Sequence, residues 1–226
     1  MSLSYRFEVK IPIPLNRYET VKVWLNNHGL LFKTHHPQRW VNSLYLDLQN
    51  LASFEENLSG ISQRKKIRIR WYHQLDNAEK AILEFKHRQA GKGYKISYET
   101  KLDFSQLPFH WSKVLKQCYL DLPNQGKIKW GNEQYPVLIC RYLRDYYLSG
   151  CKRIRATLDK QIEVFDQRFN SRINLKRSVP LGDYVLLELK CDEQYEQELA
   201  ALLATCPLRP SRHSKYVNGV RQLIWT

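Results

Sequence analysis

Alternation of polar and apolar positions is the strongest pattern in the chain, and residues 63–73, QRKKIRIRWYH, show it most clearly. An extended strand points successive side chains to opposite faces. This places cations on one face and apolar side chains on the other: Lys66, Arg68 and Arg70 against Ile67, Ile69 and Trp71. Like charges side by side on one face repel and weaken a sheet. The pattern therefore predicts a strand whose charged face needs a special environment.

The same period of two predicts further strands along the chain. In total we expect eight, over residues 5–11, 40–48, 65–73, 80–88, 95–102, 137–148, 152–165 and 183–191. Helical patterns cover residues 16–29, with Asn16 as the expected cap, and residues 50–60, 103–120 after Pro108, 192–206 and 215–223. Strands and helices do not alternate regularly, which favours an α+β fold built on an antiparallel sheet.

The charged faces recur in several of these strands. Their polar sets are Arg6, Glu8 and Lys10; Glu84, Lys86 and Arg88; Tyr142, Arg144 and Tyr146; Arg153, Arg155, Thr157 and Asp159; and Glu188 with Lys190. One alternative is a sheet with a solvated face. A solvated face would mix more uncharged polar residues, and the apolar faces still need helices to cover them. We therefore predict a barrel with its apolar side outward under the helices and its charged side inward.

A charged barrel interior has to be wet. Closely spaced cations repel, and an unpaired ion taken out of water costs several kcal/mol. Such an interior is stable only if water fills it and an anion can bind there, so we expect a receptor for polyphosphate. On this reasoning, Arg68→Ala or Lys86→Ala relieves repulsion and leaves the ligand-free protein equally or more stable.

Composition narrows the class of protein. The chain has 226 residues and 43% hydrophobic residues, as a folded globular protein has, and we find no boundary that would divide residues 1–226 into domains. A formal charge of +14 predicts a polyanionic partner. Five cysteines without a CxxC pair argue against a disulfide framework or a zinc site. We expect a loop around His35 and His36 and, without a signal peptide or a long apolar run, a soluble cytoplasmic protein.

Eight short motifs, in order, carry a resemblance to a known family. They are RFEVK, SLYLD, RIRWY, LEFK, YLRDYY, RIRATLD, LELK and RHSKY. Together they resemble the triphosphate tunnel metalloenzyme superfamily and, within it, the vacuolar transporter chaperone (VTC) domain of polyphosphate polymerases. The resemblance implies an eight-stranded antiparallel β-barrel tunnel, with helices outside, whose basic interior holds triphosphate or polyphosphate.

The resemblance also implies roles for single residues. The expected catalytic contacts to phosphate are Lys10, Arg68, Arg70, Lys86, Arg144, Arg155, Lys190 and Lys215. The expected substrate-binding residues are Lys66, Tyr142, Arg212 and Ser214. Glu188 and Glu8 would hold Mn²⁺ or Mg²⁺. The residues alone also allow Glu188 to pair with an arginine and Lys215 to cap a helix without touching substrate.

One departure separates the branches of the superfamily. The hydrolase and cyclase branch begins with E-x-E-x-K, whereas Arg6 stands here at the first of these positions. This favours a metal-dependent polyphosphate polymerase that uses ATP. A hydrolase of tripolyphosphate or nucleoside triphosphates and a non-catalytic binder of polyphosphate or RNA remain the alternatives. We expect no specific nucleic acid, and the sequence leaves open whether a membrane protein is a partner.

Overall fold

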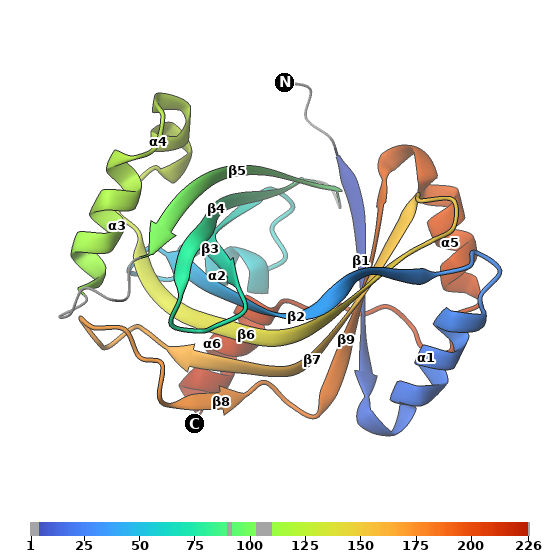
Figure 1. Cartoon of the computed structure of the whole chain (residues 1–226). Helices are drawn as coiled ribbons and strands as arrows, with labels where there is room; N and C mark the ends of the chain where they lie inside the picture. The colour runs from blue at the N-terminus through green and yellow to red at the C-terminus, as the bar shows by residue number, and fades with distance from the viewer. Residues whose placement is uncertain (1–4, 90–91, 103–109, 226) are drawn as a thin grey trace.

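The computed structural model describes residues 5–89, 92–102 and 110–225 (Figure 1). Its strands are β1 (Arg6–Pro14), β2 (Lys33–Asp47), β3 (Arg64–Tyr72), β4 (Ala78–Gln89), β5 (Lys92–Leu102), β6 (Tyr135–Leu148), β7 (Ile154–Asp166), β8 (Ser178–Pro180) and β9 (Tyr184–Asp192). Its α-helices are α1 (Tyr18–Asn27), α2 (Ala52–Leu58), α3 (Trp111–Leu120), α4 (Asn124–Trp130), α5 (Glu196–Ala204) and α6 (Lys215–Trp225). None of the helices in these ranges has the length and hydrophobicity to cross a bilayer.

The long strands close into a barrel. Their order is β6-β2-β3-β4-β5-β1-β9-β7, every neighbouring pair is antiparallel, and a pairing between β6 and β7 completes the ring. The short strand β8 adds to β7 outside this ring. The expected α+β fold with an eight-stranded antiparallel barrel is therefore confirmed, with one extra strand.

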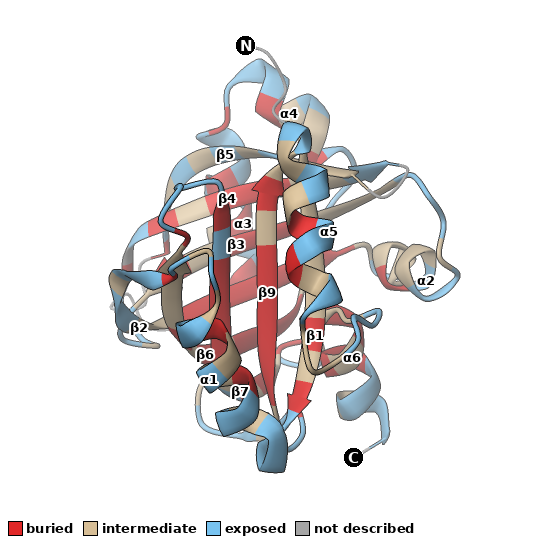
Figure 2. Ribbon diagram, turned by 90° about the vertical axis from the view of Figure 1, so that its right-hand side faces the viewer, coloured by how far each residue is buried: buried red, intermediate tan, exposed pale blue. Residues whose placement is uncertain are grey.

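Helices cover the outer face of the barrel, as the alternation predicted. On one side, Ile67, Ile69 and Phe85 pack in a buried cluster with Trp111 and Leu115 of α3. On the other side, α1 and α5 lie over β9, which Figure 2 shows as a mostly buried strand behind α5. Burying these apolar faces provides most of the driving force that closes the sheet.

Helix α6 closes one end of the barrel. It buries Tyr216 and Val220 in a cluster with Leu138 and Val164. Gly219 lets the helix approach, because a Cβ there would lie 2.9 Å from Leu138 Cδ2 and 3.0 Å from Val164 Cγ1. The Asp47 carboxylate accepts hydrogen bonds from the Tyr216 hydroxyl at 2.5 Å and from the Phe54 backbone N–H at 3.0 Å, which joins α6 and α2 to β2.

Several local predictions differ from the structure. The cap of α1 is not Asn16, which lies inside a 3₁₀ turn, and α1 begins without a side-chain cap. Strand β2 begins at Lys33, so His35 and His36 lie in a strand and not in a loop; irregular pairing around Pro37 accommodates its missing N–H. Residues 103–109 of the expected helix 103–120 lie outside the described residues. Helix α4 and strand β8 were not predicted.

The close approach of α6 predicts the effect of enlarging Gly219. Gly219→Val should lower the free energy of unfolding by about 1–3 kcal/mol, the usual cost of overpacking, as measured by urea denaturation. The control is Gly29→Val, because a Cβ at Gly29 would meet no atom within 4 Å. An equal loss of stability in both variants would contradict this view of α6.

Candidate functional site: a basic cavity inside the barrel

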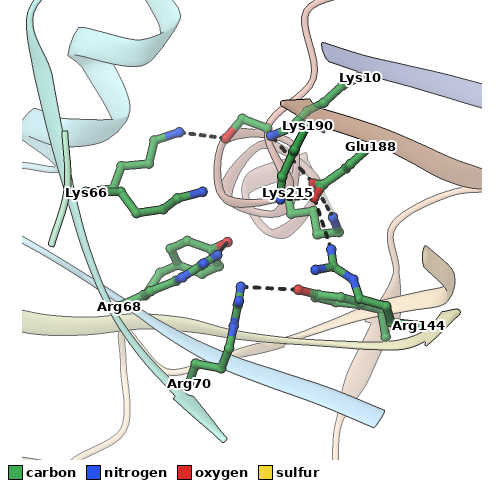
Figure 3. A pocket seen from close by; sticks show the side chains of 12 residues that line it. Lys10, Lys66, Arg68, Arg70, Arg144, Glu188, Lys190 and Lys215 are labelled. Carbon is green, nitrogen blue, oxygen red and sulfur yellow. Dashed lines mark hydrogen bonds and ion pairs between the residues drawn. The ribbon is translucent and has the colours of Figure 1, made fainter. Parts of the chain in front are cut away.

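A cavity lies inside the barrel beside the start of α6, and Figure 3 shows the side chains that converge on it. Its lining residues are Lys10, Tyr45, Lys66, Arg68, Arg70, Lys86, Tyr142, Arg144, Glu188, Lys190, Ser214 and Lys215. Eight of them are cations and one is a carboxylate. Six strands, α6 and Ser214 just before α6 contribute them, so the cavity forms only when the barrel closes.

Most of the residues expected at the site line this cavity, and three of them do not: Glu8, Arg155 and Arg212. Glu8 stands at the edge of the cavity, where its carboxylate lies 3.1 Å from Lys10 Nζ and 3.7 Å from Lys86 Nζ. Arg155 is exposed on β7. Arg212 is also exposed, and its guanidinium lies beside Gly60, after α2. The roles proposed for all these residues remain predictions.

The sequence reasoning gave no role to Tyr45, which lines the cavity. Its hydroxyl lies 3.4 Å from Arg68 Nη1. The alternation of β2 was a usable signal, because it places Ser43, Tyr45 and Asp47 on one face.

Glu84 is a buried carboxylate that holds the cations of β3. Arg68 Nε donates to Glu84 Oε2 at 2.5 Å and Lys95 Nζ to Oε1 at 2.8 Å, while Arg70 Nη1 lies 3.9 Å away. The side chain of Glu84 is only 1% exposed. Burial alone would raise its pKa, but Arg68, Arg70 and Lys95 outweigh burial and hold the pKa far below its usual range. Glu84 is therefore ionised in the folded protein.

Asp159 and Glu188 form a second network on the opposite wall. Arg144 donates from Nε to Asp159 Oδ1 at 2.5 Å and from Nη2 to Oδ2 at 2.7 Å. Lys215 Nζ lies 2.5 Å from Asp159 Oδ2 and 3.1 Å from Glu188 Oε1. Lys190 Nζ donates to Glu188 Oε2 at 2.9 Å. Burial alone raises the pKa of both carboxyl groups, but these cations outweigh it and lower the pKa.

Other cations on β3 and β4 are poorly compensated. Lys66 Nζ donates to Ser214 Oγ at 2.9 Å, and burial together with Lys10 and Lys86 lowers the pKa of Lys66 well below its usual value. Glu8 raises the pKa of Lys86, but burial and the nearby cations lower it to about 7. The buried Arg70 Nε has no hydrogen-bond partner. This wall therefore has hydrogen-bond donors and positive charge available for an anion.

The carboxylates do not form a metal site by themselves. Among the described residues, no group of three or more His, Cys, Asp or Glu side chains could hold a metal ion. Both oxygens of Glu188 already contact cations. Mg²⁺, however, is commonly held by one or two carboxylates together with substrate phosphates. Glu188 and Glu8 meet that requirement if the ion arrives with its phosphate ligand.

Comparisons with known proteins agree with this fold. The family model described as VTC domain matches residues 5–224. A putative adenylyl cyclase from Hippeastrum, described as having a dominant triphosphatase activity, has a similar structure with a TM-score of 0.51, 17% identity, and coverage of 96% of this chain and 94% of that chain. A putative adenylate cyclase from Vibrio parahaemolyticus also has a similar structure, with a TM-score of 0.53, 11% identity, and coverage of 96% of this chain and 98% of that chain. At these identities the two structures show a shared fold. The comparison with curated proteins finds no match.

The ion pairs change the stability expected of one variant. Arg68 is paired with Glu84, so the sequence-based expectation for Arg68→Ala was wrong in its premise. Arg68→Met should lower the free energy of unfolding by roughly 3 kcal/mol, because a buried carboxylate loses its closest partner. Lys66→Met removes a crowded cation and should leave stability unchanged or higher. Urea denaturation of both variants tests this, and a lower stability for Lys66→Met than for Arg68→Met would contradict it.

Proposed function

The chain belongs to the VTC domain family, and we propose that it is a metal-dependent polyphosphate polymerase that transfers the γ-phosphate of ATP to a polyphosphate chain. The observation that carries the proposal is the enclosed cavity with eight cations and one carboxylate in its lining. An apolar or mixed cavity would suit a different ligand. A linear polyanion is the ligand whose charge matches this lining along its length.

The residues can support phosphoryl transfer without a protein nucleophile. Phosphoryl transfer depends on positioning and on neutralising the charge of the phosphates. Arg68, Arg70 and Arg144 offer several N–H donors each, and Lys86 and Lys215 offer point charges. An oxygen of the terminal phosphate of the chain attacks the γ-phosphorus of ATP, the bond from that phosphorus to the bridging oxygen of ADP breaks, and ADP leaves with the electron pair.

A divalent ion, Mn²⁺ or Mg²⁺, would be held by Glu188, with Glu8 nearby, and by phosphate oxygens. When bound, it neutralises part of the phosphate charge. Lys190 and Lys215 both donate to the Glu188 carboxylate and point into the cavity (Figure 3). Their ammonium groups would then bind phosphate oxygens in place of the Glu188 oxygens.

Arg6 supports a polymerase over a hydrolase of the same fold. Its guanidinium pairs with Asp192 at 3.1 Å, and both side chains are about half exposed. A carboxylate at this position would have added to Glu8 and Glu188 as a metal ligand.

ATP and Mn²⁺ test the proposed function directly. The purified protein should convert the γ-phosphate of ATP into long polyphosphate chains, separated on a gel. Glu188→Gln should lower the rate by at least about a hundredfold, since removing a metal ligand or its support has effects of that order. Glu163→Gln is the matched control, because Glu163 pairs with Arg141 and does not line the cavity. Orthophosphate as the product would indicate a hydrolase, and no turnover would leave a binding protein.

The lowered pKa of Lys86 predicts that the protein takes up a proton when a polyanion binds. Its pKa of about 7 means that much of it is neutral at pH 8, and a bound polyanion favours the charged form. Tripolyphosphate affinity should therefore fall as pH rises above about 7. Without ligand, the folded protein binds fewer protons than the unfolded chain from about pH 7 to the usual lysine value of 10.5, so Lys86 makes stability rise with pH there.

Proton uptake is measured by calorimetry of tripolyphosphate binding in two buffers of different ionisation enthalpy, because the difference in binding heat gives the number of protons taken up. Lys86→Met should abolish the uptake, while Lys80→Met, an exposed lysine on the same strand, should keep it. Equal uptake in the Lys86→Met variant would assign the proton to another group.

A further inference from the structure

A second basic pocket lies where β3 begins and β4 ends, two residues along each strand from Lys66 and Lys86 of the cavity. We call it the rim pocket. It is lined by Glu56, Gln63, Arg64, Lys65, His87, Arg88, Gln89 and Tyr94, and holds about 210 Å³ of space for water. None of these residues lines the cavity, so the rim pocket is a separate feature.

The rim pocket continues the cavity along the strands. On β3 the residue two positions before Lys66 is Arg64, and on β4 the residue two positions after Lys86 is Arg88. Residues two apart on a strand share a face and lie about 7 Å apart. In β3–β4 pairing, Arg64 is opposite Arg88 and Lys66 is opposite Lys86. Two rows of cations therefore run from the cavity to the rim.

A third arginine, Arg212, comes from another segment and lies near the rim pocket without being one of its lining residues. Arg212 lies two residues before Ser214 of the cavity and places its guanidinium beside Gly60. Arg64 Nη1 donates to the carbonyl of Ile61 at 2.6 Å, next to Gly60, so the guanidinium groups of Arg64 and Arg212 lie near one another. In agreement, burial and the charges of Arg88 and Arg212 lower the pKa of Arg64, while Glu56 raises it. Lys65 Nζ is engaged with backbone carbonyls of Lys129 and Trp130 at 2.8 and 3.5 Å, and Glu56 is the carboxylate in the lining.

We propose that Arg64, Arg88 and Arg212 form a binding subsite for the part of a polyphosphate chain that extends beyond the cavity. The proposal rests on the proposed function, since it takes polyphosphate as the ligand. Three repelling guanidinium groups with one carboxylate nearby suit a polyanion. Their alignment with Lys66 and Lys86 favours a linear chain that already has its end in the cavity over a separate acidic ligand such as RNA. Because Arg64 and Arg88 stand about 7 Å along their strands from Lys66 and Lys86, we expect a triphosphate held inside the cavity to contact them less than a long chain does.

The test compares a short and a long ligand on one variant. Arg64→Gln/Arg88→Gln should weaken the affinity for long-chain polyphosphate by about tenfold and reduce the salt dependence of that affinity, because phosphate contacts are lost. Tripolyphosphate affinity, measured by the same calorimetry, should change less than about twofold, which also verifies that the variant is folded. The control is Arg172→Gln/Arg177→Gln, two exposed arginines between β7 and β8, which should affect both ligands alike.

The outcomes separate the subsite from the proposed function. Equal weakening of both ligands, or no weakening of the long chain, overturns the subsite even if the protein makes polyphosphate. Selective weakening of the long chain supports the subsite even if ATP gives no polymer. Single-stranded RNA that binds the rim as tightly as polyphosphate, and is not displaced by tripolyphosphate, would show that the rim serves another ligand and overturn the proposal.

Discussion

Buried ion pairs between carboxylates and cations are the constraint on which the interior of this barrel depends. Asp159 is inaccessible to solvent and Glu84 nearly so, and between them they contact Arg68, Lys95, Arg144 and Lys215. Cations without these partners would raise the free energy of the folded state by several kcal/mol each. The carboxylates permit a closed barrel to fold around a strongly basic lining before any ligand arrives. They also fix the guanidinium and ammonium groups in place, which lowers the entropy cost of binding an anion.

The same pairs limit what the cavity can hold without rearrangement. It has about 50 Å³ of space for water, which is one or two molecules. A triphosphate therefore enters only if flexible side chains move. Lys190 is suited to this movement, because the Glu188 oxygen that it contacts at 2.9 Å can be replaced by a phosphate oxygen, whereas Lys215 is also held 2.5 Å from Asp159 Oδ2. Arg144, held by two hydrogen bonds to Asp159, stays in place as a fixed donor.

Much of this site was predictable from sequence because a strand has a simple period. Lys66, Arg68 and Arg70 follow one face of β3 without interruption, and their inward direction was correctly inferred. On β7 the period fails, because a bulge with Gln161 at φ 50° changes the phase. Ile162 and Val164 consequently pack against Tyr216. Glu84 and Asp159 were visible on the charged faces, but their partners come from neighbouring strands, and only the pairing of β3 with β4 and of β6 with β7 identifies them. Arg212 lies in the irregular segment between α5 and α6, where no sequence periodicity indicates which way its side chain points.

The two walls of the cavity differ in how completely carboxylates neutralise their cations, and under the proposed function this difference would give a bound chain a direction. On the β7–β9 wall, Asp159 and Glu188 neutralise Arg144 and Lys215. On the β3–β4 wall, Glu84 pairs with Arg68, but Lys66 has a hydroxyl as its partner, and burial and nearby cations lower the pKa of Lys86 to about 7. An anion therefore gains most where positive charge is least compensated. That wall leads by two-residue steps to Arg64 and Arg88, at the end of the barrel where Lys66 contacts Ser214 and the ring of Tyr216 at the start of α6. Under the proposed function, the part of a long polyphosphate chain that does not fit the cavity would therefore be attracted toward the rim.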